Sequence, residues 1–192
     1  DDFSLASFEF YGKTLSGSKE QHPRWRRSVN LVNGVLGEAL GEVYVKRHFS
    51  PESKKKMAQL VKNLQVALGE RIASLDWMSD ATKAKAQEKL NAFTVKIGYP
   101  DKWRDYSKLA VSADKSFYEN LKEVTRFEQD FNMSELGKPV DRERWLMNPQ
   151  DVNAYYMPTT NEICFPAGIL QPPFFNPNAD DAVNYGAIGV VI

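Results

Sequence analysis

The chain has 192 residues, 42% hydrophobic and 26% charged, a composition typical of a folded domain rather than a disordered or fibrous chain. Lys and Arg together number 25, as do Asp and Glu, so no net charge favours nucleic acid or an anionic membrane. No apolar run reaches the roughly 20 residues of a membrane-spanning helix, and the single cysteine, Cys164, excludes an intrachain disulfide.

The first predicted helix is marked by apolar residues that recur at spacings of four and three, which places them on one helical face. They are Trp25, Val29, Val32, Leu36, Leu40 and Val43. A second stripe at the same spacing contains Gly34, Gly37 and Gly41. Because glycine lowers helix propensity by up to about 1 kcal/mol per residue, three glycines on one line indicate that another backbone packs closely there.

A second and a third helix are predicted between residues 50 and 97. Ser50 is a favourable N-cap, and Pro51 suits the first helical position. The apolar face of this second helix would consist of Met57, Leu60, Leu64, Leu68, Ile72 and Leu75. The third helix is predicted to begin after Ser79 and to end at Gly98-Tyr99-Pro100, since proline disfavours helical backbone in the preceding residue. Its apolar positions at helical spacing are Ala86, Leu90, Phe93 and Ile97.

A fourth helix is predicted from about Asp114. Its apolar positions at helical spacing are Phe117, Leu121, Val124 and Phe131. Glu128 interrupts this stripe, and Phe127 is available to fill the place.

The pattern changes after residue 149. Residues 152–156 and 162–165 are short strand-like runs joined by residues 157–161, which predicts a β-hairpin. Residues 165–177 hold four prolines and one glycine, a composition typical of a long ordered loop. Helical character resumes at about Asp180, and because no helix stop follows, we expect the chain to end within that helix.

The residues alone provide no recognisable catalytic or metal site. His22 and His48 lack the paired spacing on one helix that a zinc site requires, so both are predicted to be surface residues. Cys164 lies between Ile163 and Phe165, which favours a buried, inert thiol over a nucleophile. The sequence also lacks a Gly-rich phosphate loop and a nucleophile elbow.

Several motifs follow one another in an unusual combination. They are Trp25-Arg26-Arg27, Val32-Asn33-Gly34, Leu75-Asp76-Trp77-Met78, Ile97-Gly98-Tyr99-Pro100, Asn153-Ala154-Tyr155-Tyr156, Asn161-Glu162-Ile163 and the run from Phe165 to Phe175. In this order they resemble the neprilysin-like zinc metalloendopeptidases, peptidase family M13, over essentially the whole chain. Ser28 stands where vertebrate members tend to have a disulfide cysteine, which points to the bacterial, endopeptidase O-like branch.

Residues 184–192 resemble the segment that leads directly into the Gly-His-Glu-x-x-His motif of that family. The resemblance therefore implies a fragment that ends just before the zinc ligands. The expected fold is mainly α (α+β), with a helical scaffold in residues 1–150. Residues 151–192 would supply a substrate-edge hairpin, the Pro-rich loop and the start of the active-site helix of a thermolysin-like catalytic domain.

The resemblance also implies what the full-length protein does: it would hydrolyse peptide bonds of oligopeptides by zinc-activated water. Asn153 and Ala154 are implied as substrate-binding residues on an edge strand, where free backbone N–H and C=O groups can pair with a peptide. No catalytic residue and no metal ligand are expected in this chain. Alone it is expected to bind no zinc and to be inactive.

The implied partners are a peptide substrate and the remainder of the catalytic domain, with no nucleic acid and no membrane span in this chain. The resemblance favours a periplasmic or secreted location, with a cytoplasmic one left open. The alternative function is a non-catalytic helical module, a degenerate relative that keeps only a peptide-binding groove. The sequence after Ile192 discriminates between the two, because only the enzyme requires the zinc motif there.

Overall fold

The computed structural model describes residues 2–192, and the contacts divide the chain into two units, Asp1–Leu36 and Gly37–Ile192. The N-terminal unit contains α1 (Asp2–Ser7), a π-helix (Phe8–Leu15) and α2 (Arg24–Val35). Inside this unit the hydroxyl oxygen of Ser4 accepts hydrogen bonds from Gln21 Nε2 at 2.9 Å and from Arg27 Nη1 at 2.6 Å. These two bonds connect α2 and the preceding loop to α1.

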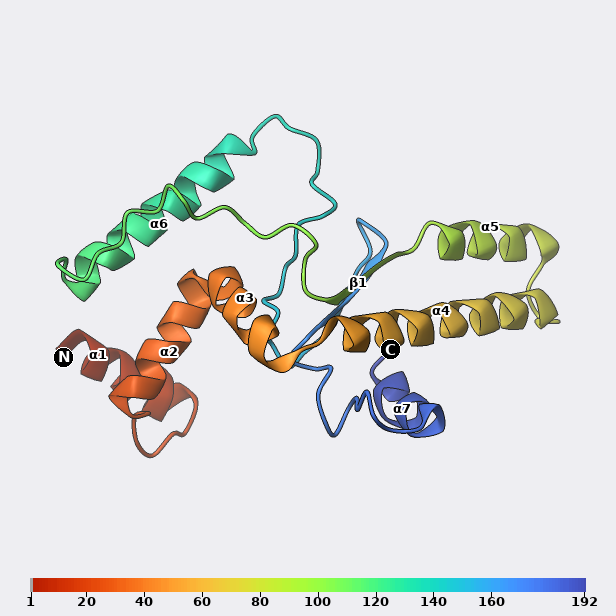
Figure 1. Ribbon diagram of the computed structural model, residues 1–192, viewed down its shortest axis with the longest axis horizontal. Coiled ribbons are helices and arrows are strands. Elements are labelled where there is room, and N and C mark those ends of the chain that lie inside the picture. The colour runs from red at the N-terminus through yellow and green to blue at the C-terminus, as the bar shows by residue number, and fades with distance from the viewer. Residues whose placement is uncertain (1) are drawn as a thin grey trace. The chain divides into compact units, whose positions relative to one another are not determined.

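The second unit is mainly helical with one small sheet (Figure 1), which confirms the predicted fold class. Its elements are α3 (Gly37–His48), α4 (Pro51–Ser74), α5 (Asp80–Asn91), β1 (Thr94–Gly98), α6 (Phe117–Ser134), β2 (Tyr155–Met157), β3 (Glu162–Pro166), α7 (Asp181–Ala187) and a 3₁₀ turn (Ile188–Val190). Within residues 2–192, no helix is both long and apolar enough to cross a membrane.

Serine caps begin the longer helices. Ser50 and Ser79 accept hydrogen bonds from the third residue after each, which confirms both predicted starts. The fourth helix begins at Phe117 rather than at Asp114, because Ser116 and Glu119 form a reciprocal capping box.

The helix predicted across residues 25–43 is in fact two helices. Leu36 leaves the helical conformation with φ −132° and ψ 34°, so α2 ends at Val35 and α3 begins at Gly37. The predicted close approach is confirmed at two of the three glycines. A Cβ at Gly37 would overlap the side chain of Asn148, and one at Gly41 would overlap the ring of Pro149, whereas Gly34 faces open space.

The prediction for residues 92–98 was wrong. The third helix ends at Asn91, and Thr94–Gly98 form β1, a parallel strand beside β3. Ile97 enters the core from this strand, with 5% of its surface exposed. Gly98 ends the strand with a φ of +76°, and a Cβ there would meet the ring of Phe49. The predicted hairpin is therefore part of a three-stranded sheet.

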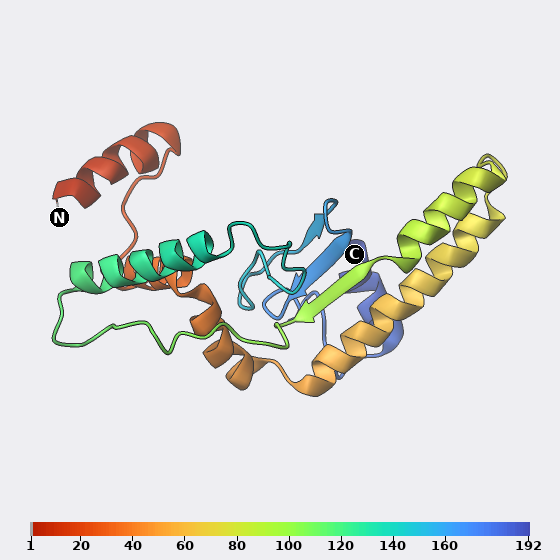
Figure 2. The ribbon, with the colours of Figure 1, turned by 90° about the horizontal axis from the view of Figure 1, so that it is seen from above.

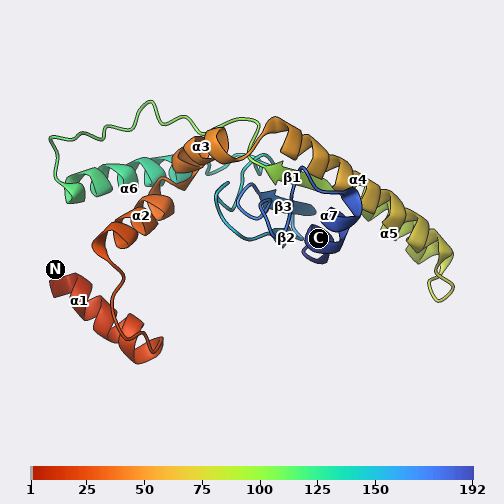
Figure 3. The same cartoon turned by 60° about the horizontal axis from the view of Figure 1, so that its bottom comes forward.

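The strand order is β1-β3-β2, which leaves β2 at one edge (Figure 3). β1 and β3 are parallel, with Thr94 opposite Glu162, and β2 and β3 are antiparallel, with Tyr155 opposite Cys164. Helix α4 runs alongside β1 and packs against α5 (Figure 2). The main core consists of Val45, Phe49, Met57, Leu60, Val61, Ile97, Phe165, Ala167, Ile169, Leu170, Phe175 and Ile188.

Helix α6 is held by the segment that precedes it. Glu128, which interrupts the predicted apolar stripe, binds Arg104 with 2.7 Å between Oε1 and Nη1. The guanidinium also lies 3.9 Å from the ring centre of Phe131. Tyr106 stacks on Phe127 with 5.6 Å between ring centres. The charged position therefore attaches α6 to residues 104–106 instead of weakening the helix.

Candidate functional site

Asn153 and Ala154 were expected on the edge strand itself, but they lie directly before it, because β2 pairs with β3 only from Tyr155 onward. Asn153 is exposed, and Ala154 is half-buried against the core. Asn153 Oδ1 accepts a hydrogen bond of 2.8 Å from the N–H of Ala154, whereas Asn153 Nδ2 has no partner within residues 2–192. In the sheet β2 pairs with β3 alone, so its other edge presents backbone groups that no strand of the described chain covers.

A buried ion pair lies in the same sheet and is connected to β2 through Tyr155. Lys96 on β1 and Glu162 on β3 approach to 2.9 Å, and their side chains are 6% and 3% exposed. Lys96 Nζ also donates to the carbonyl oxygen of Arg144 at 2.8 Å, and Tyr155 on β2 donates to Glu162 Oε1 at 3.1 Å. The cluster thus joins all three strands.

The environment of this cluster shifts three pKa values. Burial is the largest single influence and tends to raise the pKa of Glu162, but the hydrogen bonds from neighbouring side chains, that from Lys96 first among them, and the positive charge of Lys96 together outweigh it, so the pKa lies below its ordinary value. Burial raises the pKa of Tyr155, and the neighbouring Cys164 adds to the shift. Burial also raises the pKa of the Cys164 thiol to about 12. Cys164 is fully buried, as predicted, and its thiol stays protonated at neutral pH.

Acid is expected to destabilise the protein through Glu162. A carboxyl whose pKa is lower in the folded chain contributes stability above its unfolded pKa, near 4.5, and loses it as the pH falls through the folded value. We expect the unfolding free energy to decrease below pH 4.5, and the Glu162→Gln variant to show a shallower decrease. Urea unfolding from pH 7 to pH 3 measures this, with exposed Glu70→Gln as control. Equal pH slopes for wild type and Glu162→Gln would contradict the assignment.

The second tyrosine of the motif points to another neighbour. Tyr156 is 42% exposed, and its ring stacks on Phe93 with 5.8 Å between centres and 11° between planes. Lys89 Nζ lies 5.5 Å from the centre of the same ring. Tyr155 therefore binds the buried Glu162 by a hydrogen bond, whereas Tyr156 packs on Phe93.

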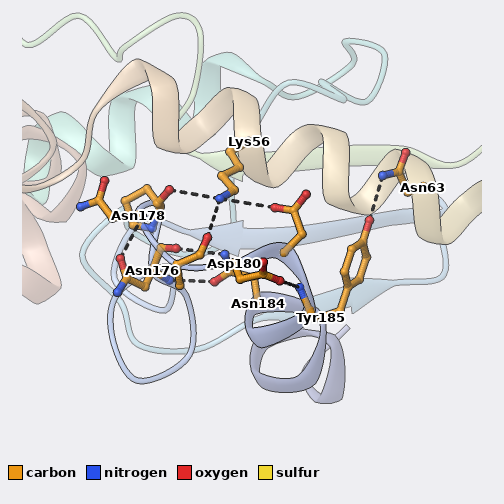
Figure 4. Close-up of polar contacts among 11 residues, drawn as sticks. Lys56, Asn63, Asn176, Asn178, Asp180, Asn184 and Tyr185 are labelled. Carbon is orange, nitrogen blue, oxygen red and sulfur yellow. Dashed lines mark hydrogen bonds and ion pairs between the residues drawn. The ribbon is translucent and has the colours of Figure 1, made fainter.

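Helix α7 is connected to α4 by polar contacts (Figure 4). Lys56 Nζ donates to the carbonyl oxygens of Pro177 at 3.1 Å and Ala179 at 2.9 Å, and lies 3.4 Å from the carboxylate of Asp181. Farther along α4, Asn63 Nδ2 donates to the hydroxyl of Tyr185 at 2.8 Å. Both contacts join residues more than 120 positions apart in the chain.

Asn184 of α7 is almost fully buried and completes this arrangement (Figure 4). Its Oδ1 accepts the N–H of Asn176, and its Nδ2 donates to the carbonyl oxygen of the same residue, both at 2.9 Å. Asp180 caps the helix by accepting the N–H of Ala182 at 2.8 Å. The loop before α7 is thereby fixed although it has no regular secondary structure.

The described residues do not fit a zinc site. Within residues 2–192, no three or more His, Cys, Asp or Glu side chains are grouped so that they could hold a metal ion. His22 and His48 are both exposed, and they belong to different units. Cys164 is enclosed and protonated.

Two polar clusters were not predicted from the sequence: the Lys96–Glu162 pair, and the contacts of Lys56 and Asn184 with the loop before α7. Lys96 and Glu162 are each a single charge next to apolar residues, but the residues around Lys96 were predicted as helix, so nothing connected the two. Lys56 carried no signal of its own, because it is one of three consecutive lysines at the start of a helix. Asn184 is the first residue of segment 184–192, to which the resemblance gives no individual roles.

The sequence matches one known protein family in two separate regions. Two family models, both described as peptidase family M13, match residues 1–100 and residues 153–192. Mouse endothelin-converting enzyme-like 1 is 37% identical over 185 residues, which are 94% of this chain and 24% of the relative.

Two solved structures are similar along nearly the whole chain. The inhibitor complex of the Mycobacterium tuberculosis zinc metalloprotease Zmp1 is 51% identical with a TM-score of 0.87, covering 98% of this chain and 28% of that one. The crystal structure of PepO from Lactobacillus rhamnosis is 32% identical with a TM-score of 0.89, covering 98% and 30%. The chain thus spans less than a third of the length of these proteins.

Proposed function

The chain belongs to peptidase family M13, a family of zinc metallopeptidases, and we propose that it is part of a zinc-dependent endopeptidase that hydrolyses oligopeptides. In this proposal residues 1–150 act as helical scaffold, and residues 151–192 belong to the catalytic domain. The names of the matched relatives support a peptidase over the non-catalytic binding module considered from the sequence.

The observation that carries the proposal is the uncovered edge of β2 with Asn153 and Ala154 before it. An extended peptide can add to such an edge by backbone hydrogen bonds, which gives affinity with little dependence on sequence. The Nδ2 group of Asn153 offers two N–H donors, and its Oδ1 accepts a hydrogen bond from the N–H of Ala154. Turning of the Asn153 side chain would release that N–H for the peptide while the carboxamide binds a peptide group itself.

Replacing Asn153 with Ala in the full-length protein should weaken peptide cleavage without unfolding the protein. The expected loss of transition-state binding is roughly 1–3 kcal/mol, because peptide groups are left without a partner. This corresponds to a decrease in kcat/KM of about 5- to 150-fold. Val152→Ala is a matched control, since Val152 is exposed next to the site and carries no polar side-chain group. Unchanged kcat/KM for Asn153→Ala across several peptides would mean that this segment has a structural role only.

We also propose that the zinc ligands lie outside residues 2–192. The isolated 192-residue chain is then expected neither to retain zinc after dialysis nor to cleave peptides, because a catalytic zinc site needs about three protein ligands in one place. Elemental analysis and a peptide cleavage assay on the isolated chain test this. Stoichiometric zinc with chelator-sensitive cleavage would contradict it.

A further inference from the structure

We propose that Lys56 and Asn184 are positioning residues: they fix α7, and through α7 they set the path of the active-site segment in the full-length peptidase. The inference rests on the proposed function, since it assumes that catalytic residues follow α7 in the chain. It assigns a role to two side chains that touch no expected substrate.

Lys56 contacts one short segment through two hydrogen bonds and one ion pair. An ammonium group has three N–H donors and no acceptor. Its three neighbours are the carbonyl oxygens of Pro177 and Ala179 and the carboxylate of Asp181, at 3.1, 2.9 and 3.4 Å. All three belong to the loop before α7 or to its first turn, and hydrogen bonds from a charged donor are stronger than neutral ones. Lys56 therefore holds this loop on α4.

Asn184 acts from the opposite side of the loop. Only 1% of its surface is exposed, and both atoms of its carboxamide pair with the backbone of Asn176. Loss of the carboxamide would leave the backbone N–H and C=O groups of Asn176 without these partners and would leave a cavity at the buried position 184. The loop from Asn176 to Asp181 is thus held at one end by Asn184 and in its middle by Lys56.

Helix α7 depends on these contacts because it is short. It has seven residues, whereas isolated helices need roughly 12–15 residues to persist in water. Ile188, which follows α7, is fully buried in the core and provides an apolar anchor at the far end. Without Lys56 we expect the end of α7 to remain attached at Tyr185 and Ile188, while its first turn and the loop before it lose their fixed position. A displacement of about 1 Å at a catalytic group can lower the rate by roughly 100-fold.

The test uses the full-length protein with Lys56→Met, Lys56→Arg and Asn184→Ala, and with Lys55→Met as matched control. Lys55 is the neighbouring residue of α4, is exposed, and makes no side-chain hydrogen bond or ion pair within residues 2–192. Hydrogen exchange of amides 181–190 and steady-state cleavage of one peptide are measured on each variant. Exchange reports on α7 whether or not the protein cleaves peptides.

For Lys56→Met and Asn184→Ala we expect amides 181–190 to exchange at least about tenfold faster, while those of β1 and β3 keep wild-type rates. We expect kcat to fall about 10- to 100-fold with KM within about threefold, since the substrate edge is untouched. Lys56→Arg should recover most of kcat because it keeps the charge and the donors, and Lys55→Met should match wild type.

Three results would overturn the inference. They are wild-type exchange in Lys56→Met, faster exchange spread equally over all elements, and faster exchange of amides 181–190 with unchanged kcat. A wild-type protein that cleaves no peptide would instead refute the proposed function, and the exchange rates would then still decide whether Lys56 and Asn184 hold α7.

Discussion

Replacing Lys96 with Met is expected to lower the free energy of unfolding by about 3–5 kcal/mol, because it leaves the Glu162 carboxylate buried without its positive partner. Natural domains have about 5–15 kcal/mol of stability in total, so this single change removes a large share. Urea unfolding at pH 7 measures the loss. Lys85→Met is the matched control, since the Lys85–Glu88 pair is solvent-exposed and is expected to contribute no resolvable stability.

The free energy of unfolding that is lost in Lys96→Met should depend on pH in a defined direction. Burial is the largest single influence on the pKa of Glu162, so without Lys96 we expect it to outweigh the remaining hydrogen bonds and to raise this pKa above the unfolded value, with the carboxyl best tolerated when it is protonated. A group with a raised folded pKa loses stability as the pH rises through that value. The cost of Lys96→Met should therefore be smaller at pH 4 than at pH 7. An equal cost at both values would show that the ammonium acts only through packing.

A double variant separates the pair from its surroundings. Lys96→Met combined with Glu162→Leu removes both charges, so no unpaired ion stays buried, and the double variant should be less destabilised than the sum of the two single variants. Additive costs would indicate that Lys96 and Glu162 stabilise the fold independently, for example through the carbonyl oxygen of Arg144 and the hydroxyl of Tyr155.

The same pair shows which parts of the fold the sequence can and cannot predict. The helix starts at Ser50 and Ser79 depend on a hydrogen bond between residues three positions apart, which the sequence shows directly. Both predicted starts are confirmed. Phe93 and Ile97 follow a helical spacing with Ala86 and Leu90, yet Thr94–Gly98 form a strand. Their partner β3 lies more than 60 positions away, and Lys96 meets Glu162 across a separation of 66 residues. A pattern within a short window contains no information about such a partner.

The candidate site was predictable only as a motif. Asn153 and Ala154 were identified by resemblance, and nothing in their own chemistry distinguishes them from other surface residues. Their position beside an uncovered strand edge follows from the strand order, in which a distant strand, β1, takes the other side of β3. Lys56 and Asn184 were not predictable for the same reason, since their partners lie in a Pro-containing loop whose path no periodicity describes.

Phe174 and Phe175 provide the second large expected effect, and one that the sequence could not assign. The two residues are identical neighbours in a Pro-rich loop, so composition predicts the same burial for both. In the structure Phe175 belongs to the core with 1% of its surface exposed, whereas Phe174 is 36% exposed. The difference arises because the N–H groups of both residues donate to the carbonyl oxygen of Gln171, which closes a tight turn and directs the two rings differently.

Phe175→Ala is therefore expected to cost about 3–5 kcal/mol of unfolding free energy, since it removes a fully buried ring and leaves a cavity in the main core. Phe174→Ala, the matched control, should cost far less because its ring is already partly hydrated. Urea unfolding of both variants measures these two losses of unfolding free energy. Equal losses would contradict the difference in burial between Phe174 and Phe175. Asn176, which pairs with Asn184, directly follows Phe175. The cavity should therefore also speed hydrogen exchange in amides 181–190, because the ring supports the same loop that Lys56 and Asn184 hold.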